Sequence, residues 1–176
     1  MLGKTSVFLI GPMGSGKTAV GRHLARVLHL PFHDSDGDIE RRTGVDIPYI
    51  FEREGEAGFR QREREAIESL TQLPAIVLAT GGGAVLLPEN RRRLAERGCV
   101  VYLSTSVAQQ AERVRHGRNR PLLAAGDAAE RLGQLMDSRA PLYAEIADVI
   151  VSTDGRRVQA VAAQVLRELA TARGGT

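Results

Sequence analysis

The segment GPMGSGKT, residues 11–18, has the residue types and the spacing of a phosphate-binding loop. Its glycines allow backbone N–H groups to surround phosphate oxygens, and the start of a following helix adds a partial positive charge. An apolar run precedes the segment and a helical pattern follows it, which is the context that this motif requires. We expect Lys17 to reach the β- and γ-phosphates of a nucleoside triphosphate and the Thr18 hydroxyl to bind Mg²⁺.

Two carboxylates follow in the segment HDSDGD, residues 33–38. Asp34 and Asp36 are two positions apart on a segment that leaves a strand, so both side chains are expected to face the same way. Ligands of parallel sheets bind at the carboxyl ends of the strands, where the phosphate loop also lies. One carboxylate would then serve Mg²⁺ and the other an acceptor hydroxyl. The alternative is an acidic turn in which Asp36 or Asp38 caps the helix that follows.

A second glycine-rich segment, LATGGGAVLL, ends another apolar run and contains the triple glycine Gly81, Gly82 and Gly83. Other phosphate-loop proteins often have an acid at this position, whereas this chain has Thr80 followed by the glycines. The triple glycine is expected to let the backbone approach a bound ligand closely. The alternative is a tight turn that needs positive φ angles.

Basic residues are concentrated in two further segments. In FEREGEAGFRQREREAIESL the arginines lie among glutamates, and most of them are expected to form surface ion pairs. The segment RHGRNRPLLAAGD, residues 115–127, contains Pro121 and Gly126 and lies between two helical patterns. We expect it to be a mobile lid whose arginines meet a phosphate, and the alternative is an exposed basic loop.

The remaining pattern is that of an α/β protein. Buried strands are predicted by apolar, β-rich runs, which lie at 6–10, 75–79, 99–103 and 148–151, with a weaker one at 31–32. Helices are predicted at 17–28, 55–72, 88–97, 106–115, 128–146 and 157–171, and another begins at DGDIERR. This alternation, without repeats or a linker, predicts one domain over residues 1–176 with a parallel sheet covered on both faces.

Bulk composition restricts the class of protein. The chain has 176 residues, 43% of them hydrophobic and 26% charged, and its single cysteine, Cys99, excludes an internal disulfide. No stretch approaches the ~20 apolar residues of a membrane span, so we expect a cytoplasmic protein without membrane contact. The net charge of +3 suits anionic ligands, and the lack of an aromatic-rich basic stretch predicts no nucleic-acid partner.

The motifs GPMGSGKT, DSD, GEAGFR, TGGGAV, RPLL and SRAPLY occur in the order and spacing of the shikimate kinases, which the chain resembles from about Val7 to about Arg167. The resemblance implies a three-layer P-loop kinase fold with a five-stranded parallel sheet in the order 2-3-1-4-5, an acceptor-binding region at about 34–62 and a mobile lid at about 115–127. It also implies ATP-dependent phosphorylation of the shikimate 3-hydroxyl, giving shikimate 3-phosphate and ADP in the pathway to chorismate and the aromatic amino acids. We expect the protein to be a monomer.

The same resemblance assigns roles on the nucleotide side. Lys17 and Arg120 of RPLL would act as catalytic residues on the transferred phosphoryl group, while Thr18, with Asp34 through water, would hold one Mg²⁺ ion with ATP. Arg113, or alternatively Arg115, and Arg156 of GRRV would contact the adenine side, where Val158 replaces a proline that is frequent in the family. The expected ATP-binding residues are Gly14, Ser15, Gly16, Lys17, Thr18, Arg113, Arg120 and Arg156.

On the acceptor side, the resemblance implies that Asp36 takes the shikimate hydroxyls, including the attacking one, as a general base or as a positioning group. Arg60 of GFR and Arg139 of SRAP would bind the shikimate carboxylate with their guanidinium forks, and Gly82 would donate its backbone N–H. Two alternatives stay open. One is a kinase for another hydroxy acid such as gluconate, and the other is an ATP-binding regulator that binds nucleic acid in a salt-sensitive way.

Overall fold

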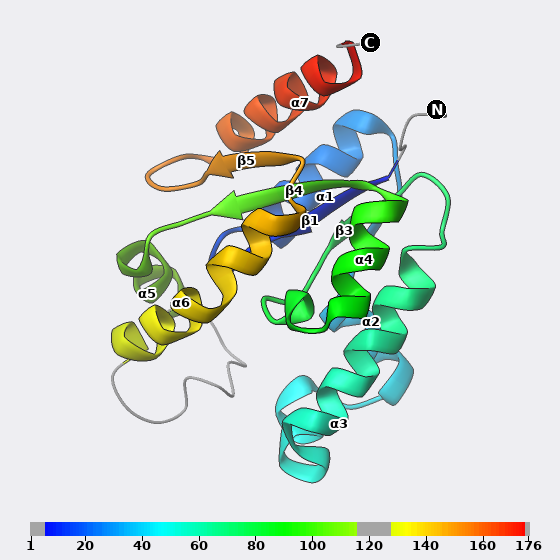
Figure 1. Ribbon diagram of the computed structural model, residues 1–176, viewed down its shortest axis with the longest axis vertical. Helices are drawn as coiled ribbons and strands as arrows, with labels where there is room; N and C mark the ends of the chain where they lie inside the picture. The colour runs from blue at the N-terminus through cyan, green and yellow to red at the C-terminus, as the bar shows by residue number, and fades with distance from the viewer. Residues whose placement is uncertain (1–5, 116–127, 175–176) are drawn as a thin grey trace.

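Five parallel strands form the centre of the structure, a computed structural model that describes residues 6–115 and 128–174 (Figure 1). Their order is β2-β3-β1-β4-β5, as the resemblance to P-loop kinases predicts. The register places Val7 of β1 beside Val77 of β3 on one side and Cys99 of β4 on the other. The strands are β1 (Val7–Ile10), β2 (Phe32–Asp34), β3 (Val77–Ala79), β4 (Cys99–Ser104) and β5 (Val149–Ser152).

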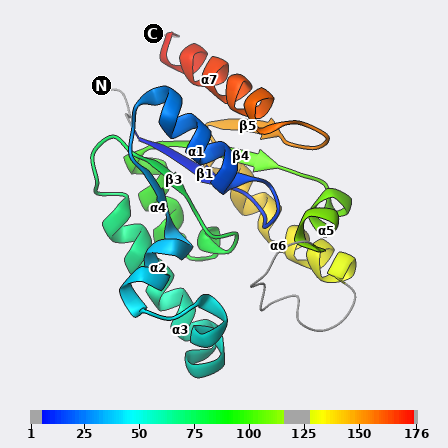
Figure 2. The ribbon, with the colours of Figure 1, turned by 180° about the vertical axis from the view of Figure 1, so that it is seen from behind.

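Helices connect the strands and lie on both sides of the sheet (Figures 1 and 2). They are α1 (Lys17–Leu28), α2 (Ser35–Thr43), α3 (Ile47–Leu70), the short η1 (Ala84–Leu86), α4 (Pro88–Arg97), α5 (Val107–Arg115), α6 (Ala128–Ile146) and α7 (Val158–Gly174). Helix α3 begins earlier than the predicted residue 55, because Asp46 caps its first turn by accepting a hydrogen bond of 3.0 Å from Tyr49 N. Gly55 interrupts α3 with φ 69° and ψ −175°, a conformation that is essentially restricted to glycine.

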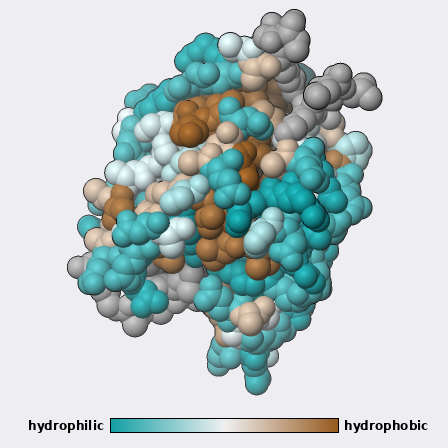
Figure 3. Space-filling view, viewed as in Figure 1, coloured by the Kyte–Doolittle hydropathy of each residue, from teal (hydrophilic) through white to brown (hydrophobic). Residues whose placement is uncertain are grey.

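Alternating side chains along β1 separate two hydrophobic cores. Phe8 and Ile10 point to the face that α3, α4 and α6 cover, whereas Val7 and Leu9 point to the face that α1 and α7 cover. All four side chains are fully buried, so the strand is apolar at every position rather than at every second one. The edge strand β5 alternates instead between buried and exposed residues. In Figure 3, hydrophilic side chains predominate over α3 and hydrophobic ones gather over the middle of the molecule.

The carboxyl ends of the strands lie at one edge of the sheet, because all five strands are parallel. The phosphate loop follows β1, Asp34 ends β2 and the triple glycine follows β3, so this edge brings the predicted motifs together. Residues 116–127 of the predicted lid, with Arg120 among them, lie outside the described residues. In the described part of the chain, no helix is both long enough and apolar enough to span a membrane.

Gly98, between α4 and β4, packs against the ring of Phe8. A Cβ atom on Gly98 would lie 2.4 Å from Phe8 Cε2, and the Phe8 ring is fully buried. We predict that Gly98→Ala lowers the free energy of unfolding by about 1–3 kcal/mol, the usual effect of overpacking a core. Urea-induced unfolding measures this change.

Gly133→Ala is the matched control. Gly133 lies in α6, and nothing lies within 4 Å of the position that its Cβ would take. Alanine is therefore expected to raise the free energy of unfolding by about 0.5–1 kcal/mol through its higher helix propensity. Two variants of equal stability would contradict the packing described for Gly98.

Candidate active site

A cavity of about 990 Å³ opens at the carboxyl edge of the sheet. It extends from the phosphate loop to Phe51 and Phe59 of α3, so the predicted nucleotide and acceptor ends belong to one cavity. Arg120 lies outside the described residues, and all other predicted site residues line the cavity. These are Gly14, Ser15, Gly16, Lys17, Thr18, Asp34, Asp36, Arg60, Gly82, Arg113, Arg139 and Arg156.

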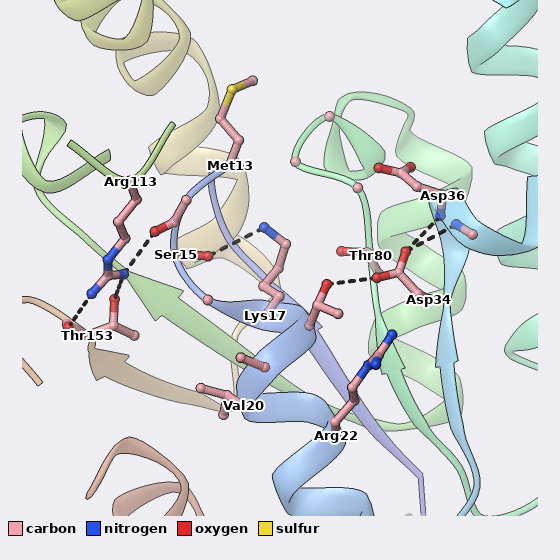
Figure 4. Close-up of a pocket in the computed structure, with 18 of the residues that line it drawn as sticks. Met13, Ser15, Lys17, Val20, Arg22, Asp34, Asp36, Thr80, Arg113 and Thr153 are labelled. Carbon is pink, nitrogen blue, oxygen red and sulfur yellow. Dashed lines mark hydrogen bonds between the residues drawn. The ribbon is translucent and has the colours of Figure 1, made fainter. Parts of the chain in front are cut away.

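Lys17 lies inside the curve of the phosphate loop (Figure 4). Its Nζ donates hydrogen bonds of 2.7 Å to Gly11 O and 2.8 Å to Pro12 O, and lies 3.4 Å from Ser15 Oγ. Gly16, which precedes α1, has a left-handed φ of 87°, so glycine suits the turn from the loop into the helix. The loop thus holds a buried ammonium group at the start of α1, where a phosphate would also be favoured.

Asp34 and Asp36 have different neighbours (Figure 4). Asp34 Oδ2 accepts a hydrogen bond of 2.8 Å from the Thr18 hydroxyl, and its Oδ1 accepts bonds from Asp36 N and Gly37 N at 3.1 and 3.3 Å. Asp34 is therefore the cap of α2, and the alternative with Asp36 or Asp38 as the cap is wrong. Because β2 ends at Asp34, Asp36 lies in the first turn of α2, and the predicted strand alternation does not apply to it.

The triple glycine lies where buried charged groups approach the backbone. A Cβ atom on Gly81 would lie 2.7 Å from Glu63 Oε1 and 2.9 Å from Asp36 Oδ1. A Cβ atom on Gly83 would lie 2.4 Å from both terminal nitrogens of Arg60. No residue of the triple glycine has a positive φ, so the alternative of a turn that needs such angles is wrong. Close approach of these side chains therefore accounts for glycine at positions 81 and 83.

Arg60 and Glu63 form an ion pair at the acceptor end. Arg60 Nη1 donates to Glu63 Oε2 at 2.6 Å, while Nη2 lies 3.3 Å from Glu56 Oε1 at the surface. Glu63 is fully buried, and this burial raises the pKa of its carboxyl group, against the opposing charges of Arg60 and Arg139. The sequence analysis missed Glu63. Its only signal in the sequence is that it lies one helical turn after Arg60. Glu56 lies one turn before Arg60, so this spacing does not distinguish Glu63 from Glu56.

Tyr143 connects α6 to the triple glycine. Its hydroxyl donates a hydrogen bond of 2.5 Å to Gly82 O, and its ring lies 5.0 Å from the ring of Tyr102. Burial raises the pKa of Tyr143 well above its ordinary value, so the hydroxyl keeps its proton and remains a donor. Arg139 lies one helical turn earlier on α6 and is also buried, so one helix positions both the Gly82 peptide and the second arginine.

Arg113 links the phosphate loop to the end of β5. Its guanidinium donates hydrogen bonds of 2.8 Å to Gly14 O, 3.1 Å to Thr153 Oγ1 and 3.0 Å to Thr153 O (Figure 4). Arg115, the alternative for the adenine side, does not line the cavity and faces solvent beside Glu112. Arg156 lines the cavity and is fixed by bonds to the backbone of β5 and to a side chain of α7. Arg113 is thus better placed than Arg115 to contact a ligand in the cavity.

Comparisons with a family model, with protein sequences and with a solved structure all point to one family. The family model for shikimate kinase matches residues 13–170. The chain is 58% identical to the shikimate kinase of Nitrosococcus oceani over 97% of this chain and 90% of that protein, and 51% identical to that of Shewanella denitrificans over 96% and 99%. A solved structure of shikimate kinase from Acinetobacter baumannii in complex with shikimate has a TM-score of 0.93 and 46% identity, covering 95% of this chain and 93% of that one.

We predict that Tyr143→Phe lowers the free energy of unfolding by about 1–3 kcal/mol, because the Gly82 carbonyl loses its buried donor. Urea-induced unfolding measures the change. Tyr102→Phe is the matched control: it removes a hydroxyl from the neighbouring ring, which has no hydrogen bond to the triple glycine, and should lower the free energy of unfolding by less than Tyr143→Phe does. Equal losses in both variants would show that the bond to Gly82 adds nothing.

Proposed function

The chain belongs to the shikimate kinase family, and we propose that it transfers the γ-phosphoryl group of ATP to the 3-hydroxyl of shikimate, giving shikimate 3-phosphate and ADP. One observation carries this proposal: a single cavity has a phosphate loop at one end and two arginines, Arg60 and Arg139, at the other. A phosphoryl donor and a carboxylate-bearing acceptor would meet in it. We expect the enzyme to act as a cytoplasmic monomer in the pathway to chorismate.

At the nucleotide end, the N–H groups of the phosphate loop would surround the β- and γ-phosphates. Lys17 Nζ would exchange its hydrogen bonds to Gly11 O and Pro12 O for bonds to phosphate oxygens. Arg113 and Arg156 line the part of the cavity that we assign to adenine. Phosphoryl transfer depends mainly on positioning and on neutralising charge, which these cations would supply together with Arg120 of the proposed lid.

Thr18, with Asp34 through a water molecule, would hold the Mg²⁺ that accompanies ATP. Thr18 Oγ1 and Asp34 Oδ2 are 2.8 Å apart, and both are hard oxygen ligands of the kind that Mg²⁺ prefers. A nucleotide-bound Mg²⁺ ion needs few protein ligands, because phosphate oxygens and water complete its shell. When bound, Mg²⁺ would help to neutralise the charge that develops on the transferred phosphoryl group.

At the acceptor end, the guanidinium groups of Arg60 and Arg139 would bind the shikimate carboxylate, and Gly82 N would donate to the same substrate. Guanidinium suits this role because its planar donors pair with a carboxylate bidentately. Asp36 would accept hydrogen bonds from the shikimate hydroxyls and so direct the attacking oxygen toward the phosphate loop. Its carboxylate lies beside Gly81 and lines the cavity.

The direct test is ADP release with Mg-ATP in the presence of shikimate, gluconate, a nucleoside monophosphate or no acceptor. Among these acceptors, we expect only shikimate to support turnover, because only a carboxylate-bearing ring with the right hydroxyls engages both Asp36 and the two arginines. Faster turnover with gluconate or a nucleoside monophosphate would refute the proposed acceptor. ATP binding without any acceptor-dependent turnover would refute the kinase activity.

We predict that Asp36→Asn lowers kcat at least about 10²-fold while the KM for ATP stays within about twofold, since Asp36 would act on the acceptor hydroxyl rather than on the nucleotide. Steady-state kinetics with both substrates varied measures the two effects. Asp38→Asn is the matched control, because Asp38 lies in the same turn of α2 but pairs with Arg41 and Arg42 and does not line the cavity. An equal loss of ATP affinity in Asp36→Asn would contradict the acceptor role.

A further inference from the structure

Three ionisable side chains form what we define as the carboxylate-binding cluster: Arg60, Arg139 and Glu63. Glu63 is fully buried, and Arg139 is 4% exposed. Glu63 Oε2 accepts from Arg60 Nη1 at 2.6 Å, and among the described residues Glu63 Oε1 has no hydrogen-bond partner. The proposed mechanism uses the two arginines and leaves this buried carboxylate without a role.

The formal charges of the cluster decide which anions it can neutralise. Glu63 is counted as ionised because it forms the 2.6 Å ion pair with Arg60, so two guanidinium groups and one carboxylate leave a charge of +1, which one carboxylate on a ligand neutralises. Glu63 Oε1 and Asp36 Oδ1 both lie within 3 Å of the Cβ position of Gly81, so Asp36 adds its negative charge close by. Charges interact more strongly at such buried positions than in water, so a second negative charge on a ligand would be strongly disfavoured.

We propose that Glu63 is a specificity-determining residue that restricts the carboxylate-binding cluster to groups with a single negative charge. It neutralises one of the two guanidinium groups, so a monocarboxylate finds one positive charge to pair with. A dianion such as sulfate or hydrogen phosphate brings a charge that finds no partner. This inference rests on the proposed function, because it takes the cluster to bind the carboxylate of the acceptor.

A purely orienting role for Glu63 predicts a different outcome. If Glu63 only held Arg60 in place, its loss would weaken the binding of monoanions and dianions by the same factor. If it sets the charge, its loss changes the two affinities unequally, because the Glu63→Gln protein with a dianion bound has the same total charge as the wild type with a monoanion bound. The ratio of dianion affinity to monoanion affinity therefore separates the two roles.

Glu56 supplies the matched control. It contacts the same guanidinium as Glu63, with Glu56 Oε1 3.3 Å from Arg60 Nη2, but its side chain is 55% exposed. Solvent and salt screen a charge in that position. Glu56→Gln therefore removes an ion pair from Arg60 without changing the charge that a buried ligand experiences.

The experiment measures the affinities of sulfate and acetate for the full chain with a magnesium complex of a non-hydrolysable ATP analogue bound, so that the phosphate loop is occupied. Affinities follow from the rise in melting temperature with anion concentration at constant ionic strength. We expect Glu63→Gln to raise the sulfate-to-acetate affinity ratio about tenfold. We expect Glu56→Gln to leave the ratio within about twofold. An unchanged ratio in Glu63→Gln, or an equal rise in Glu56→Gln, overturns the proposal.

Glu63→Met, which also removes the charge but leaves no buried polar atom unpaired, decides the matter if Glu63→Gln does not fold. It is expected to raise the sulfate-to-acetate ratio by about the same factor, and an unchanged ratio would overturn the proposal. The readout requires no turnover. If the wild type phosphorylates shikimate but the variants have the same sulfate-to-acetate affinity ratio as the wild type, only the role of Glu63 is refuted. If the wild type shows no shikimate-dependent ADP release, the proposed function is refuted.

Discussion

The acceptor end depends on glycine having no Cβ atom at positions 81 and 83. Arg60, Glu63 and Asp36 occupy the space that Cβ atoms on Gly81 and Gly83 would take. One methyl group on Gly83 would displace the Arg60 guanidinium and with it the ion pair to Glu63. The backbone after β3 thus forms one wall of the acceptor end, and close approach rather than a special φ explains glycine at positions 81 and 83.

The two ends of the cavity hold their charges by different means. At the nucleotide end, Lys17 and Arg113 donate to backbone carbonyls of the phosphate loop, which phosphate oxygens can replace as acceptors. At the acceptor end, Arg60 is paired with a buried carboxylate, and breaking such a pair leaves an uncompensated charge in the interior. The nucleotide end can therefore exchange partners readily, whereas the acceptor end is fixed before the substrate arrives.

The sequence was sufficient to predict the parts of the site that depend on local pattern. The phosphate loop was predicted because strand, glycine-rich loop and helix are contiguous, and the sheet order followed from a resemblance over nearly the whole chain. Asp36 was placed on the correct edge for a wrong reason, because the chain turns into α2 after Asp34. Glu63 and Tyr143 were missed, because each is defined by a partner far along the chain or by burial. Among many glutamates on α3, no spacing distinguishes the one that the triple glycine covers.

The acceptor end also shares its residues with the core. Arg60 on α3 and Arg139 on α6 come from helices that pack on the same face of the sheet as Phe8 and Ile10. Tyr143 belongs to that core and also binds the Gly82 carbonyl, so the packing that places α6 places the triple glycine as well. By contrast, α1, the helix that follows the phosphate loop, packs with α7 in the core on the opposite face. Stability and acceptor recognition are therefore coupled on one face of this sheet.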